Sequence, residues 1–279
     1  MKKISRRSFL AAAGLSVAAL ALTACGGSSA STASSVASSA ASSEAASTSA
    51  AAGELTTVEA GKLTMATNAA FPPYEMTTDA GEFEGIDIET AQAIADKLGL
   101  ELQIDDMDFD AALLSVQQGK ADIVMAGVTV TDERKAVMDF SDSYATGIQS
   151  IIVPEGSDIA SPDDLAGKKI GTQRGTTGYI YCSGDFGDDN VVAYDDGLTA
   201  VQALNNGQVD AVVIDNAPAQ EFVAANPGLV ILDTSYAEED YAIGMAKGSS
   251  LEDAVNAALK ELKADGTLQS IVDKYITAE

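Results

Sequence analysis

The sequence has no histidine, no tryptophan and only two cysteines among its 279 residues. Without histidine, Ser-His-Asp catalysis, Cys-His catalysis and His-ligated metal sites are all excluded. Cys25 and Cys182 alone cannot form a zinc cluster, so any catalysis would have to depend on Asp, Glu, Lys or Tyr.

Basic residues are also scarce, with 16 Lys and Arg against 42 Asp and Glu, for a net charge of −26. The first 24 residues hold four of the basic residues and no acid, which leaves 12 against 42 and a net charge of −30. Binding to nucleic acid, or to an anionic membrane through a basic patch, needs clustered Lys and Arg. Neither partner suits this chain.

The N-terminus has the pattern of an export signal, because basic residues at positions 2–7 precede an apolar run from Phe9 to Leu22. That run is too short and too rich in alanine for a membrane span, which needs about 20 apolar residues. Residues 5–10 resemble a twin-arginine signal, but two adjacent arginines also occur in general secretory signals. We expect residues 1–24 to be a signal peptide, with the export route left open.

The segment Leu22-Thr23-Ala24-Cys25 resembles a bacterial lipobox, in which the cysteine is diacylated and becomes the new N-terminus. The alternative is an ordinary cleavage site with a chance cysteine. The following stretch is almost only Ser, Ala, Gly and Thr, which cannot bury enough apolar surface to offset its ordering entropy. We therefore expect a lipidated Cys25 and a disordered tether over 25–59, anchored to the outer face of the cell membrane. A lipidated Cys25 leaves Cys182 without a disulfide partner.

From about residue 60, short β-branched strands alternate with amphipathic helices, which is typical of an α/β fold. The predicted strands cover 63–67, 102–104, 123–126, 169–171 and 211–214. The predicted helices cover 88–98, 109–118, 198–204 and 218–225, and Ser250 is expected to open the last helices through a capping box. Two longer β-type stretches, 146–154 and 239–246, suit two strands that cross between lobes.

Only two arginines, Arg134 and Arg174, follow the signal segment. Arg134 comes after an apolar strand and after Thr131, which is a candidate helix N-cap. Strand ends followed by helix N-termini are where α/β sheets bind ligands, and an arginine there can grip a carboxylate with two hydrogen bonds. The plainer alternative is a surface ion pair, with Asp132, Asp139 or Asp142.

Three other features allow both a binding and a structural interpretation. The turn 171–178 has neither a P-loop nor a dinucleotide fingerprint, but its N–H groups and hydroxyls could cradle a carboxylate. Asp215 follows an apolar strand, where it could take an ammonium group or cap the next helix through the N–H of Ala217 or Ala219. Phe71 and Phe109 could belong to the core or stack on a ligand.

The acidic clusters at 105–110 and 185–189 lack the Gly and Glu spacing of an EF-hand loop. We interpret them as solvated surface, and we expect no metal and no cofactor.

Five ordered segments carry a family resemblance, namely 66–75, 85–88, 127–135 with 139–142, 175–178 and 210–216. From about 60 to 276 the chain resembles the bacterial extracellular solute-binding proteins of polar amino acid ABC importers (family 3). The resemblance implies a two-lobed α/β fold of the type II periplasmic-binding-protein class, with two hinge strands and a ligand cleft between the lobes. It also implies a monomeric, non-enzymatic protein that delivers an amino acid to permease subunits. Lobe 1 would comprise 60–146 plus 243–279, and lobe 2 would comprise 147–242.

The same resemblance implies a role for individual residues. Arg134 would grip the ligand α-carboxylate, helped by the backbone of Thr129 and by Thr176 or Thr177. Asp215 and the carbonyl of Gly127 would take the α-ammonium group. The whole implied ligand-binding set is Asn68, Phe71, Phe109, Gly127, Val128, Thr129, Arg134, Gln173, Thr176, Thr177 and Asp215.

Within this set, Phe71 and Phe109 would sandwich the ligand side chain, and Asn68 and Gln173 would contact its tip. Asn68 departs from relatives that take cationic ligands, which often carry Asp there, so Glu75 or Asp108 would have to compensate if either faces the cleft. A cationic or amide ligand is slightly favoured.

Two other functions on this fold are a cleft enzyme such as a cyclohexadienyl dehydratase and an extracellular amino-acid sensor or adhesin. The dehydratase substrate needs no ammonium partner, so Asp215 beside Arg134 favours transport over that enzyme. The sequence does not separate transport from sensing.

Overall fold

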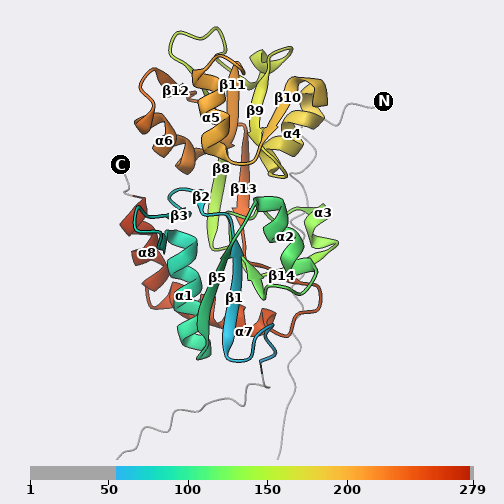
Figure 1. The fold of residues 1–279 in the computed structure, drawn as a ribbon, viewed down its shortest axis with the longest axis vertical. Coiled ribbons are helices and arrows are strands. Elements are labelled where there is room, and N and C mark those ends of the chain that lie inside the picture. The colour runs from blue at the N-terminus through green and yellow to red at the C-terminus, as the bar shows by residue number, and fades with distance from the viewer. Residues whose placement is uncertain (1–54, 277–279) are drawn as a thin grey trace, which may run out of the picture. The chain divides into compact units, whose positions relative to one another are not determined.

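The computed structural model describes residues 55–276, in which two large sheets and one small sheet are covered by helices (Figure 1). The predicted signal peptide, the lipidation site Cys25 and the tether up to residue 54 lie outside the described residues. Within 55–276, every helix is too short or too polar to span a bilayer.

The first large sheet has the strand order β5-β1-β6-β14-β7. Its strands are β1 (Lys62–Thr67), β5 (Glu101–Asp106), β6 (Ile123–Val124), β7 (Met138–Phe140) and β14 (Gly244–Ala246). β1 is parallel to β5 and β6, as the alternation of strands and helices predicts, whereas β14 is antiparallel to β6 and β7. The helices of this half are α1 (Ile86–Leu98), α2 (Phe109–Gln117), α3 (Asp132–Lys135), α7 (Glu252–Ala264) and α8 (Thr267–Tyr275).

The second large sheet has the order β10-β9-β11-β8-β12, with β13 also paired to β8. Its strands are β8 (Ala145–Pro154), β9 (Ile170–Gln173), β10 (Val191–Tyr194), β11 (Ala211–Asp215), β12 (Leu229–Ile231) and β13 (Ala237–Tyr241). Its helices are α4 (Thr177–Phe186), α5 (Gly197–Asn205) and α6 (Asn216–Ala225), with 3-10 turns η1 (Pro162–Leu165) and η2 (Asp188–Asn190). The small sheet contains β2 (Ala70–Phe71), β3 (Glu75–Thr77) and β4 (Phe83–Glu84).

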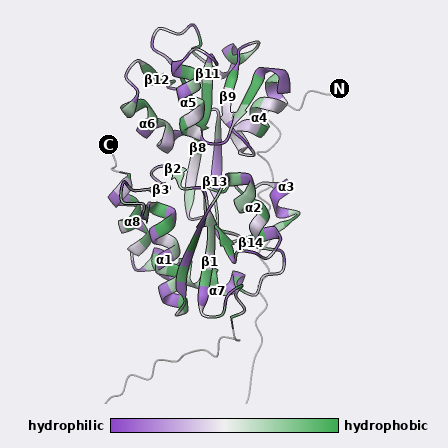
Figure 2. Cartoon of the chain, in the orientation of Figure 1, coloured by the Kyte–Doolittle hydropathy of each residue, from purple (hydrophilic) through white to green (hydrophobic). Residues whose placement is uncertain are grey.

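The middle strands are apolar on both faces because helices cover both sides of each large sheet. In β11, Val213 packs in a cluster with Cys182, whereas Val212 and Ile214 belong to a second cluster that contains Phe222. This split follows from the two-residue period of a strand. Figure 2 shows the corresponding hydrophobic strands at the centre of each sheet.

Two strands of the second sheet, β8 and β13, extend from it towards the first sheet (Figure 1). They pair antiparallel from Gln149 opposite Ala237 to Ala145 opposite Tyr241. The predicted stretch 239–246 is therefore not one strand: its first part belongs to β13 and its last part to β14 in the other sheet. The chain thus passes between the two halves twice, through adjacent segments.

Two further expectations are corrected. The capping box at Ser250 is wrong, because α7 begins at Glu252 after Leu251 and has no side-chain cap hydrogen bond. The hydroxyl of Ser249, one residue earlier, accepts the N–H of Leu251 at 3.2 Å. The strand predicted over 123–126 ends at Val124, because the chain then leaves the sheet.

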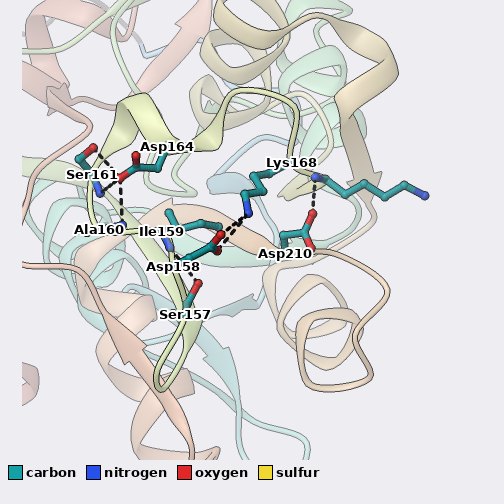
Figure 3. A network of polar contacts seen from close by, with 9 residues as sticks. Ser157, Asp158, Ile159, Ala160, Ser161, Asp164, Lys168 and Asp210 are labelled. Atoms are coloured by element: carbon teal, nitrogen blue, oxygen red, sulfur yellow. Dashed lines mark hydrogen bonds and ion pairs between the residues drawn. The ribbon is translucent and has the colours of Figure 1, made fainter.

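A polar network lies at the edge of the second half, around η1 (Figure 3). Lys168 pairs with Asp158 at 3.0 Å, and Asp210 accepts the N–H of Lys169 at 2.7 Å. Asp164 accepts the N–H and hydroxyl of Ser161, both at 2.9 Å. These groups are exposed, so the ion pair contributes little, while the carboxylates cap the backbone of the loop.

Both ends of α1 are set by glycines with positive φ, Gly85 at 130° and Gly99 at 69°. Gly99 is the left-handed C-cap, and space around it is open. At Gly85, an added Cβ would lie 2.2 Å from the carbonyl oxygen of Tyr74. Both sites have a positive φ that favours glycine, but Gly85, with ψ at 175°, lies outside the left-handed region and also lacks steric room.

We expect Gly99→Ala to lower the free energy of unfolding by about 1 kcal/mol, which is the cost of a left-handed alanine. Gly85→Ala should cost at least about 2 kcal/mol more, because the backbone around Tyr74 must also move. Urea unfolding of both variants measures the difference. Equal losses would contradict the steric argument.

Candidate functional site

A cavity lies where the carboxyl ends of strands from both large sheets meet, the usual place for ligands in α/β proteins. Its volume is about 20 Å³, which is room for about one water molecule. We call it the cleft cavity. It is lined by Asn68, Phe71, Glu75, Phe109, Ala126, Gly127, Thr129, Arg134, Gln149, Gln173, Thr176, Thr177, Val213, Ile214, Asp215 and Tyr241. A ligand of amino-acid size can enter only if the walls move apart.

The structure brings every residue of the implied ligand-binding set to this lining except Val128. Val128 is fully buried and packs in the cluster of α2 and β6, with Phe109. Its neighbours Gly127 and Thr129 line the cavity.

Arg134 is held in α3, whose N-cap Thr131 accepts the N–H of Arg134 as predicted. The side chain is only 8% exposed. Its guanidinium donates to the carbonyl of Thr129 at 2.8 Å and to that of Gly175 at 3.1 Å, and it lies 5.4 Å from the ring centre of Phe109. Burial lowers the pKa of the guanidinium and Glu239 opposes this, but an arginine stays protonated.

The alternative of a surface ion pair for Arg134 does not fit this arrangement. Asp139 pairs with Lys247 instead. Arg174, in contrast, is exposed, and it approaches Asp195 at 3.5 Å outside the cleft cavity. The two arginines of the described residues therefore occupy very different environments.

Asp215 caps the next helix, as one interpretation predicted, and it also lines the cleft cavity. One carboxylate oxygen caps α6 by accepting the N–H of Ala217 at 3.0 Å, and the other accepts the N–H of Ile148 at 2.8 Å. The side chain is 2% exposed and lines the cleft cavity. Burial raises its pKa to about 6, although both backbone hydrogen bonds act in the opposite direction. A cationic group beside Asp215 would favour the ionised form.

Asn68 and Gln173 meet across the cleft. The Gln173 amide donates to Asn68 Oδ1 at 2.8 Å, and the Asn68 amide donates to the carbonyl of Met107 at 3.0 Å. Thr176 is the N-cap of α4, and its hydroxyl also donates to the carbonyl of Gln173 at 2.8 Å. Phe71 packs against Tyr74, with ring centres 5.8 Å apart.

Of the two acids that were candidates to compensate for Asn68, Glu75 lines the cleft cavity and Asp108 does not. Asp108 precedes α2 and lines a separate cavity of about 140 Å³ with Arg174 and Asp195. Glu75 is fully buried, and burial, followed by the nearby Asp87, raises its pKa well above the usual range.

Asp87 is a buried acid that sequence reasoning missed. One of its oxygens accepts the N–H of Gly127 at 3.0 Å and the hydroxyl of Tyr144 at 2.7 Å. Burial raises the pKa of Asp87 to about 6, and these two hydrogen bonds act in the opposite direction. Burial raises the pKa of Glu75 further than that of Asp87, so Glu75 is the acid that keeps its proton, while Asp87 accepts from Gly127 and Tyr144.

Glu239 is a second buried acid that was not predicted. It lies at 6% exposure between the exposed Glu238 and Asp240. The alternation along β13 was the available signal, since Glu239 shares its face with Tyr241. Within residues 55–276, no group of three acids or cysteines is placed to hold a metal ion.

Comparisons with known proteins fit this geometry. Residues 63–278 match the family described as bacterial extracellular solute-binding proteins, family 3. The L-cystine-binding protein TcyJ of Escherichia coli (strain K12) is 33% identical over 226 residues, covering 79% of this chain and 85% of TcyJ.

Two solved structures are similar over most of the described chain. One is the arginine-, lysine-, histidine-binding protein ArtJ of Geobacillus stearothermophilus, with 34% identity and a TM-score of 0.75, covering 78% of this chain and 96% of that one. The other is an ancestral arginine-binding protein bound to glutamine, with 41% identity and a TM-score of 0.75, covering 78% and 99%. The proteins that resemble this chain are thus two-lobed amino-acid-binding proteins.

The raised pKa of Glu75 gives a testable pH dependence. An unfolded glutamate titrates near pH 4.3, whereas folded Glu75 keeps its proton to higher pH. Above pH 4.3 the folded state therefore holds a proton that the unfolded state lacks, and stability falls as pH rises until the folded pKa is reached. Glu75→Gln removes this loss.

We expect the unfolding free energy of Glu75→Gln, relative to wild type, to increase with pH above about 4.5, by up to about 1.4 kcal/mol per pH unit. Urea unfolding at pH 5, 6, 7 and 8 measures the trend, with Glu82→Gln at an exposed position as the control. A difference that does not change with pH would show that Glu75 is ionised in the folded protein.

Proposed function

The chain belongs to family 3 of the bacterial extracellular solute-binding proteins, and we propose that it captures a polar L-amino acid outside the membrane for an ABC importer. The observation that carries the proposal is the pair Arg134 and Asp215, two buried side chains of opposite charge that line one cavity. An α-amino acid presents the complementary carboxylate and ammonium groups.

The two charged side chains come from different halves of the molecule, since Arg134 lies in α3 and Asp215 ends β11. A ligand that contacts both therefore favours the closed arrangement of the two halves. A ligand lacking either charge would leave a buried group unpaired, which discriminates strongly against it.

The side chain of the ligand would occupy the space between Phe71 and Phe109, where Glu75 and Asn68 supply polar groups. With Arg134 and Asp215 engaged by the zwitterion, Glu75 is the acid left over. It can ionise beside a cationic side chain or, protonated, hydrogen bond to an amide. This supports a cationic or amide amino acid, and the acidic surface would steer cations towards the site.

Delivery to permease subunits completes the proposed role. The importer family and the binding function of the relatives support it. We propose that a monomeric chain is held at the outer face of the cell membrane through lipid on Cys25, with residues 25–59 as the tether, because two acyl chains suffice for stable anchoring. We assign the protein no enzymatic activity.

A thermal-shift screen of the 279-residue chain against all common L-amino acids tests the proposal. A ligand at 100 times its Kd adds about 2.7 kcal/mol, which for a domain of this size raises the Tm by about 5–11 °C. Arg134→Ala should abolish this rise, Arg134→Lys should keep part of it because the charge remains, and Arg174→Ala should retain it. No response to any α-amino acid would refute the proposed function.

The proposed contact of Asp215 with the ammonium group predicts how affinity depends on pH. Free Asp215 has a pKa of about 6, and a bound ammonium group lowers it, so below pH 6 binding must first release a proton. In the Glu75→Gln background we expect the affinity for L-arginine to be constant above pH 6.

Below pH 6 that affinity should fall by about tenfold per pH unit at most. Isothermal titration calorimetry measures it. Adding Asp215→Asn should weaken binding and remove the dependence, and a dependence that survives this change would assign it to another group.

A further inference from the structure

Three hydrogen bonds converge on one oxygen of Glu239 behind the cleft cavity. Its Oε2 accepts the hydroxyl of Thr177 at 2.9 Å, the hydroxyl of Thr129 at 3.0 Å and the amide of Gln149 at 3.0 Å. All of the groups are buried. A carboxylate is the acceptor best suited to three donors, because hydrogen bonds to an ionised group are the strong ones.

The donors come from separate parts of the fold. Thr129 follows β6 in the half built on the first sheet, whereas Thr177 begins α4 and Gln149 lies in β8 of the other half. The two hydroxyl oxygens are 3.4 Å apart, so they meet across the cleft. Glu239 itself lies on β13, one of the two connecting strands. Its carboxylate thus joins both halves at the point where they connect.

Each threonine hydroxyl carries only one proton. Each hydroxyl lies closer to Glu239 Oε2, at 3.0 and 2.9 Å, than to the other hydroxyl, at 3.4 Å, so the carboxylate takes both protons and the hydroxyls present lone pairs to any other partner. Thr129 and Thr177 line the cleft cavity, so they offer acceptors to its contents. A carboxylate in the cavity must then be held by donors other than these two hydroxyls, such as Arg134, while an ammonium group could donate to them.

We propose that Glu239 is a positioning residue of the ligand site, which fixes Thr129 and Thr177 as acceptors and holds the two halves together in the closed arrangement. This rests on the proposed function. The bond from Thr129 needs both halves in place, whereas those from Thr177 and Gln149 lie within the second half. The Thr129 bond therefore forms after the ligand has entered, and its loss should accelerate dissociation rather than slow association.

Glu239→Gln tests this with little change of shape, since the amide keeps an acceptor but loses the charge. With radiolabelled L-arginine and a chase of unlabelled ligand, we expect dissociation about tenfold faster, as for loss of one charge-assisted hydrogen bond. Association should stay within about twofold, because encounter precedes closure. Glu238→Gln, one residue away and exposed, is the matched control with wild-type rates.

A double-mutant cycle separates positioning from a general structural role. In a Thr129→Val, Thr177→Val background, Glu239→Gln should change dissociation by less than about twofold, because the groups through which it acts are gone. An equal effect in both backgrounds, or wild-type dissociation in Glu239→Gln, would overturn the inference. The unfolding of each ligand-free variant is measured in parallel.

A second experiment leaves Glu239 unchanged and replaces one of its hydrogen-bond donors. Thr177→Val should also accelerate dissociation of the ligand. Thr177→Ser should dissociate at close to the wild-type rate, since serine keeps the hydroxyl. Failure of the serine to do so would count against the inference. A wild-type chain that bound no α-amino acid would instead overturn the proposed function, and the two failures are distinguished by that measurement alone.

Discussion

A guanidinium group buried between two halves of the molecule is the constraint on which the rest of the site depends. Arg134 cannot lose its proton, so its donors need acceptors that do not come from water. The structure supplies the carbonyls of Thr129 and Gly175, one from each half. The arginine therefore fixes the loop after β6 against the start of α4, and the cleft cavity is what lies between them.

The acids around this cation are held by equally specific contacts. Asp215 is bound by two N–H groups, Asp87 by the N–H of Gly127 and a tyrosine, and Glu239 by two hydroxyls and an amide. Buried carboxylates are tolerated only when such donors are present. Among the described residues Glu75 has no such donors, and burial raises its pKa well above the usual range, so it is the acid whose charge a ligand can most easily change.

Much of the fold could be predicted, because periodicity and glycine positions are local signals. The helix at 88–98 and the strand at 211–214 are found at Ile86–Leu98 and Ala211–Asp215. The capping box at Ser250 failed because the hydroxyl of the preceding residue, Ser249, accepts the N–H of Leu251 and α7 has no side-chain cap. The single stretch at 239–246 divides into two strands because its partners lie in different sheets, which no local pattern records.

By itself, the sequence excluded catalysis and metal binding through histidine, because the chain has none. It also placed two charged residues, Arg134 and Asp215, each after a predicted strand. Only the tertiary structure decided which acids accompany them. Glu75, Asp87 and Glu239 belong to separate elements, and an acidic chain offers 42 candidates of the same type. Burial and hydrogen-bond donors select among them, and both arise from residues distant in sequence that folding brings together.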